Sequence, residues 1–188
     1  MFTDFSSPLV SVKLRDELPI PIKKSLLNIE RAQWAHHPKY HGKAEFFIHY
    51  HEGLLNTSSY ILNTLVELLN GSNDPALHET KLKEIYRAGM SLINNAEHHH
   101  KIEDHLYFPE FKRLEPKLGA GIDLLENDHL ALSAALGQFS ISLNQSMIPG
   151  SSYSAWGLLY QSAIDVDRIL NRHLNDEEEI IIPIFLRH

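Results

Sequence analysis

The sequence of 188 residues contains no cysteine. Disulfides, iron–sulfur clusters, thiolate zinc sites and cysteine nucleophiles are therefore all excluded. The sequence also lacks a run of roughly 18 apolar residues that could cross a membrane, and it does not begin with the basic and then apolar segment of a secretory signal. We therefore expect a soluble, cytoplasmic protein that does not act at a membrane.

Basic residues are scarce as well. Lys and Arg together number 17, against 24 Asp and Glu, which gives a formal net charge of −7. A nucleic-acid-binding protein needs a stripe of basic residues that displaces counterions from phosphates, and the sequence has none. We expect no nucleic-acid partner.

Clusters of Pro and Gly, with 9 of each in the chain, mark the breaks between four long segments. The segments run from about 43 to 70, 76 to 113, 122 to 145 and 153 to 185, and each has apolar residues at the three/four spacing of an amphipathic helix. The sequence therefore predicts an all-α fold, an antiparallel up-down-up-down four-helix bundle over residues 43–188. Residues 1–42 form an N-terminal extension, in which residues 22–34 can fold as a short helix.

Histidine is the residue in excess, with 13 copies. Each predicted helix interrupts its apolar stripe with a histidine, and two helices add a glutamate four residues later. The interruptions are His51 between Phe47 and Leu54, His99 and Glu103 between Ala96 and Leu106, His129 between Leu125 and Leu132, and His173 and Glu177 between Leu170 and Ile180. Unpaired polar groups are costly in a core, but a bound cation removes this cost. Imidazole and carboxylate together suit zinc, iron or manganese.

Six such side chains exceed the four ligands of a tetrahedral ion but suit two ions bridged by both carboxylates. The predicted metal ligands are His51, His99, Glu103, His129, His173 and Glu177. Neighbours on a helix are roughly 100° apart, so only one residue of the run 98–100 is expected to point along the stripe, and we assign His99 to it. Contributions from His49, His98, His100 and Glu178 are left open, with the flanking histidines expected to be solvated or to be outer donors.

The two halves of the chain repeat. Placing His99 on His173 also places Glu103 on Glu177 and residue 104 on residue 178, and this repeat predicts a pseudo-twofold bundle with the metal pair on its axis. Within the acidic run 176–179, only Glu177 is expected to point inward. The other three residues are expected to form a solvated face, with Glu178 as a fallback ligand.

Four stretches carry a resemblance to a known family: HHHKIEDHLYFP at 98–109, HLNDEEEIIIP at 173–183, HEGLL from His51, and ENDHLAL ending at Leu132. Together they resemble the hemerythrin-like HHE cation-binding domain, over about residues 43–185. The resemblance implies an antiparallel four-helix bundle around a non-haem di-iron centre. Carried over residue by residue, the four histidines of the predicted set would be terminal ligands, and Glu103 and Glu177 would be bridging carboxylates.

One position departs from the oxygen-carrying hemerythrins. They have a further histidine where this sequence has Leu125, and the remaining set of four histidines and two glutamates is similar to the iron-centre repair branch. Each ion would then have two histidines, which predicts two nearly equivalent ions. A ferritin-like di-iron bundle is disfavoured, because Leu170 stands where its second Glu-x-x-His signature needs a glutamate.

Taken with these residues, the resemblance implies two iron ions as cofactors, in a non-haem di-iron centre bridged by oxo or hydroxo. The expected function is the handling or sensing of dioxygen, nitric oxide or iron, without turnover of an organic substrate. Two alternatives are kept: a di-iron oxidoreductase that activates oxygen or peroxide, or an iron-centre repair protein; and an iron-dependent regulatory module that a protein partner, not identified by the sequence, recognises.

Overall fold

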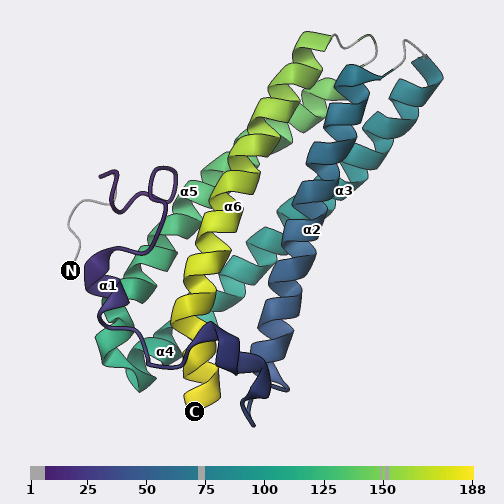
Figure 1. Cartoon of the computed structure of the whole chain (residues 1–188). Coiled ribbons are helices and arrows are strands. Elements are labelled where there is room, and N and C mark those ends of the chain that lie inside the picture. Colours follow the sequence, from purple (N-terminus) through teal and green to yellow (C-terminus); the bar gives the residue numbers. More distant parts are fainter. Residues whose placement is uncertain (1–6, 72–74, 149, 151–152) are drawn as a thin grey trace.

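Four long helices form the body of the molecule. The computed structural model describes residues 7–71, 75–148, 150 and 153–188, and within these ranges all regular structure is helical. The long helices are α2 (Lys43–Asn70), α3 (Pro75–Ile102), α5 (Gly119–Ser146) and α6 (Tyr153–Arg187). Helices α2 and α5 both pack against α6 and against α3 (Figure 1). The chain is thus an all-α helical bundle, as predicted, and no helix in the described ranges is long and apolar enough to cross a bilayer.

Shorter elements connect or precede the long helices. The N-terminal segment contains α1 (Ile20–Lys23) and the 3-10 helix η1 (Arg31–His36). A π-helical turn, η2 (Glu103–Tyr107), continues α3 into α4 (Phe108–Leu114), and the 3-10 turn η3 (Pro116–Leu118) leads into α5. Helix α6 runs without a break through Pro183.

The π-helical turn η2 changes which residues face the core. Continuation of the α-helical stripe placed Leu106 in the core, but its side chain is 66% exposed, whereas Phe108 is fully buried. A π-helical turn holds more residues than an α-helical turn, so the buried face shifts along the sequence after Glu103. The prediction for Leu106 was therefore wrong.

The apolar core is divided into two clusters. Cluster A contains Leu54, Ala96, Leu132 and Leu170, and cluster B contains Phe47, Phe108, Leu125 and Ile180. Every one of the predicted metal ligands lies, along its own helix, between a residue of cluster A and a residue of cluster B. The histidines and glutamates therefore form a polar layer between two apolar cores.

Helices α3 and α5 approach closely at Gly89. A Cβ atom at this position would lie 2.7 Å from Cδ2 of Leu143 and 3.2 Å from the ring of Phe139. A side chain here would have to displace those of Leu143 and Phe139, so glycine lets the two helices pack this closely.

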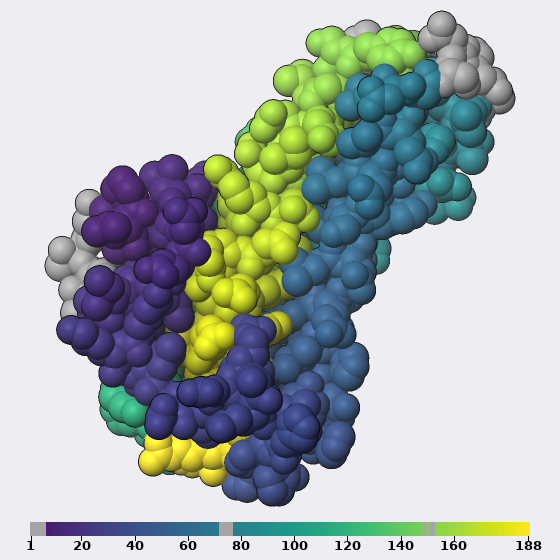
Figure 2. All heavy atoms as spheres, viewed as in Figure 1, coloured from purple at the N-terminus to yellow at the C-terminus, as the bar shows by residue number. Residues whose placement is uncertain are grey.

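The N-terminal segment lies against α6, as Figure 2 shows. It contributes Val10, Leu18, Ile22 and Trp34 to cluster B. The expected helix over 22–34 is not present as one element; α1 ends at Lys23, and the backbone is extended at residue 30 before η1 begins. The physical reason is that the apolar side chains of this segment reach cluster B from two short helices, α1 with Ile22 and η1 with Trp34, and from the backbone around them, so no single helical periodicity describes them. Residues 1–6 lie outside the described residues.

Candidate metal centre

The six predicted ligands come together in the centre of the bundle. They are contributed by α2, the end of α3 with η2, α5 and α6, and their exposed fractions are all low: His51 1%, His99 7%, Glu103 0%, His129 5%, His173 0% and Glu177 0%. Charged side chains are almost never buried to this extent unless they are paired or bind an ion. The burial agrees with the inward orientation that the sequence predicted.

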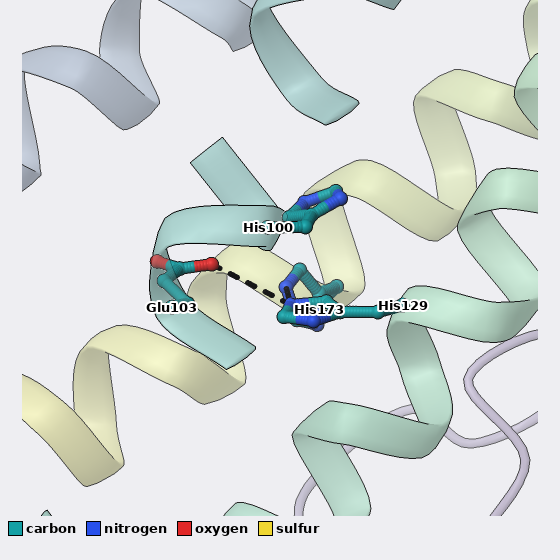
Figure 3. Close-up of side chains that lie close together, drawn as sticks. All are labelled: His100, Glu103, His129 and His173. Atoms are coloured by element: carbon teal, nitrogen blue, oxygen red, sulfur yellow. Dashed lines mark hydrogen bonds and ion pairs between the residues drawn. The ribbon is translucent and has the colours of Figure 1, made fainter. Parts of the chain in front are cut away.

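The side chains form two groups that share one residue. The first group is His51, His99, Glu103 and Glu177, and the second is His100, Glu103, His129 and His173 (Figure 3). Within each group, one ligand atom per residue lies within 4.8 Å of every other. Glu103 belongs to both groups, so it stands where two neighbouring ions would share a ligand.

The imidazole nitrogens converge in pairs. Nε2 of His51 lies 3.0 Å from Nε2 of His99, and Nε2 of His129 lies 3.2 Å from Nε2 of His173. Adjacent donor atoms around one six-coordinate ion are also about 3 Å apart, given metal–ligand distances of about 2.1 Å. Each pair of nitrogens therefore has the separation that a shared cation requires.

The two carboxylates lie between the pairs of histidines. Oε1 of Glu103 is 2.9 Å from Nε2 of His99, while its Oε2 is 3.5 Å from Nε2 of His129. Oε2 of Glu177 lies 3.5 Å from Nε2 of His51 and also 3.5 Å from Nε2 of His173. Each glutamate thus faces one histidine of either pair, which is the placement of a bridging carboxylate.

Without an ion these groups are costly to bury. Neither carboxylate oxygen of Glu103 or Glu177 has a hydrogen-bond partner among the described residues. Burial raises the pKa of Glu103 to about 8 and raises that of Glu177 well above its ordinary value, while it lowers the pKa of His100 and His173 well below theirs. A cation removes this penalty, because it binds unprotonated imidazole and ionised carboxylate. The donor set therefore fits a metal pair.

A second layer of carboxylates orients the histidines. Nδ1–H of His51 donates to Oε1 of Glu178 at 3.1 Å, and Nδ1–H of His129 donates to Oδ1 of Asp104 at 2.7 Å. The sequence repeat pairs these two carboxylates, so the outer contacts follow the same pseudo-symmetry as the ligands. With Nδ1 engaged in this way, the free lone pair of each ring is on Nε2 and points into the layer.

The run of three histidines does not place only one side chain inside. His99 and His100 are both buried, at 7% and 6% exposed, whereas His98 is exposed. The centre of the inward-facing stripe of α3 passes between His99 and His100, so the two side chains point to different groups of ligands. The expectation of a single inward histidine was therefore wrong. His49 is exposed and its Nδ1 lies 2.9 Å from the carbonyl oxygen of Glu45, outside the layer.

The acidic run on α6 is also buried more than expected. Asp176 is 1% exposed and Glu178 is 9% exposed, so the prediction of a solvated face was wrong for both. The reason is the N-terminal segment, whose Arg31 pairs with Glu178 at 2.6 Å and with Glu179 at 2.8 Å. Glu178 therefore acts on His51 from outside, between that ring and Arg31.

Arg15 is the second basic residue that the N-terminal segment places behind the centre. Its guanidinium lies 2.9 Å from Oδ1 of Asp128 and 2.9 Å from Oδ2 of Asp176, and Asp128 in turn lies 3.5 Å from Nδ1 of His173. The contribution of this segment to the site left no signal in the sequence, because a single arginine in an irregular segment has no periodicity. An ion-pair partner was needed for the buried Asp128, but its helix position alone does not say where that partner lies.

Comparison with known families agrees with this geometry. The family model described as the hemerythrin HHE cation binding domain matches residues 44–185. The chain belongs to this family. Searches of curated proteins and of solved structures gave no match. The match spans α2 to α6 and leaves out Arg15 and Arg31, so the two arginines behind the centre are features of this hemerythrin-like chain outside the matched region.

Proposed function

We propose that this hemerythrin-like protein binds two iron ions and uses them to handle or sense dioxygen, nitric oxide or iron itself. His51 and His99 would hold one ion, His129 and His173 the other, and Glu103 and Glu177 would bridge the pair. The observation that carries the proposal is the position of the two buried carboxylates, each facing histidines of both pairs. When bound, ferrous iron supplies an open position for a small ligand and a one-electron redox couple.

The choice of iron rests on membership of the hemerythrin-like family, which implies a di-iron centre, and the donor set supports a pair of ions. Imidazole together with carboxylate suits iron, zinc and manganese, but six donors in two groups with shared carboxylates favour a pair of six-coordinate ions over a single tetrahedral zinc. The apolar side chains of clusters A and B, which lie on either side of the layer, limit the access of water to it. This enclosure favours small, uncharged ligands over an organic substrate.

The proposal includes the direction of the helices. Along α2 and α5 the chain passes from cluster B to cluster A, and along α6, and along α3 with its continuation through η2 into α4, it passes from cluster A to cluster B. This alternation supports an antiparallel up-down-up-down four-helix bundle. Such an arrangement brings one His or one His-Glu pair from each helix to the same height.

The metal content of the purified protein tests the proposal. After anaerobic reconstitution with ferrous iron, elemental analysis is expected to give two irons per chain, and the visible spectrum is expected to change when nitric oxide is added. Reconstitution with zinc in parallel is the control for selectivity. One zinc per chain together with no uptake of iron would contradict the proposal.

A further inference from the structure

His100 lies inside the metal centre but has no role in the set of six ligands. It is 6% exposed, and its Nε2 has no hydrogen-bond partner among the described residues. Its ring stacks on that of His129, with centroids 4.2 Å apart and an interplanar angle of 21°, and it meets the ring of His173 edge-on at 5.4 Å. A buried ring nitrogen without a partner costs free energy, so the position calls for a ligand of that nitrogen.

The helix places His100 on the opposite side of Glu103 from His99. Glu103 follows His99 by four residues and His100 by three, and both spacings bring side chains together on a helix. The ligand atom of His99 belongs to the first group and that of His100 to the second. One carboxylate is thus flanked by two histidines that face different groups.

The sequence repeat is broken at this position. The residue of α6 that corresponds to His100 is Leu174, which follows His173 directly, is 1% exposed and belongs to cluster A. No imidazole therefore joins the first group from α6 in the way that His100 joins the second from α3. The first group has two imidazoles and the second has three.

We propose that His100 is a direct metal ligand and the third histidine of the ion held by His129 and His173. The two ions are then inequivalent, in contrast to the near equivalence that four histidines predict. This inference rests on the proposed metal pair, and it adds a residue that the pairing of the two halves does not provide.

The test uses the full chain loaded with cobalt, a paramagnetic divalent ion that binds the same donors. His100→Leu copies the side chain of the matching position 174, and His98→Leu changes the exposed neighbour as a control. Competition with a chelator gives the dissociation constants of both ions. Proton NMR counts the strongly shifted, exchangeable N–H signals, one from each coordinated imidazole.

The unmodified chain and His98→Leu are expected to bind two cobalt ions and to give five shifted N–H signals. His100→Leu is expected to give four shifted N–H signals and to weaken the binding of one of the two cobalt ions by more than about 100-fold. Even the loss of a partner outside the ligand set lowers metal affinity by about 10–100-fold. Four signals in the unmodified chain, or equal affinities in both variants, would overturn the role of His100 while leaving the metal pair intact. Uptake of fewer than two cobalt ions by the unmodified chain would contradict the pair itself, and with it this inference.

Discussion

Replacement of Arg15 by alanine is expected to destabilise the metal-free protein strongly. The side chain is 1% exposed and pairs with Asp128 and Asp176, which are 0% and 1% exposed. It also donates to the carbonyl oxygen of Val10 at 2.6 Å. Asp176 keeps Arg172 as a partner, at 3.0 Å from its Nε, but Asp128 loses the guanidinium that neutralises it. Breaking one buried pair in this way costs about 3–5 kcal/mol.

Urea unfolding of the metal-free protein, followed by circular dichroism, measures this cost. The matched control is Arg113→Ala, since Arg113 also makes two hydrogen bonds to one carboxylate, that of Glu110, at 2.9 and 2.7 Å, but both side chains are exposed. Solvent screens the exposed pair, so the control should lose little stability. Equal losses in the two variants would refute the reasoning from burial.

The loss of stability in Arg15→Ala should depend on pH and should be reversed by a second substitution. Burial raises the pKa of Asp128 to about 6 although Arg15 acts in the opposite direction. Without Arg15 the carboxyl of Asp128 can become protonated and so avoid an unpaired buried charge. The loss of stability caused by Arg15→Ala should therefore be smaller at about pH 5 than at about pH 8. Arg15→Met combined with Asp128→Leu removes both charges and should recover most of the stability.

Three further outcomes are expected. Glu103→Ala and Glu177→Ala should each lose the two-ion stoichiometry in elemental analysis, whereas His98→Ala should keep it; retention of both ions by either glutamate variant would contradict the bridging role. The free energy of unfolding of the metal-free protein should fall as pH rises from about 6.5 to about 8, by at most about 1.4 kcal/mol per pH unit for each buried carboxyl, because the pKa of Glu103 is raised to about 8 only in the folded state. Below about pH 6.5 the lowered pKa values of His100 and His173 act in the opposite direction, so urea titrations at several pH values above about 6.5 check this. Gly89→Val should cost about 1–3 kcal/mol because its side chain meets α5, while Gly137→Ala, which points into open space, should raise the melting temperature; a neutral Gly89→Val would count against the close helix contact.

The long helices were predictable because their signal is periodic. The first was expected over 43–70 and runs from Lys43 to Asn70, and the inward orientation of His51 followed from the apolar residues on either side of it. The same rule failed after Glu103, because the π-helical turn η2 adds a residue that no hydrophobic pattern announces. Periodicity thus places a side chain only as far as the helix keeps its pitch.

The residues that the sequence did not reveal act through contacts far along the chain. Arg15 meets Asp128 and Asp176 at separations of 113 and 161 residues, and Arg31 meets Glu178 at 147. Helical spacing connects residues three or four positions apart, so it cannot identify such pairs. The sequence did contain a signal for His100, because the repeat between the two halves aligns this histidine with Leu174. The argument from helical angles allowed only one inward histidine in the run 98–100, so this difference was not used.

The polar layer also bears on how the bundle unfolds. Clusters A and B are two apolar cores in series, and a layer of histidines and glutamates lies between them. A continuous core makes a small domain unfold as one unit, but here the apolar packing is interrupted, and the proposed metal pair with its shared carboxylates would couple the packing of the two ends. If the pair is bound as proposed, loss of the ions would remove this coupling as well as stability, and either end of the bundle would open locally while the other keeps its packing.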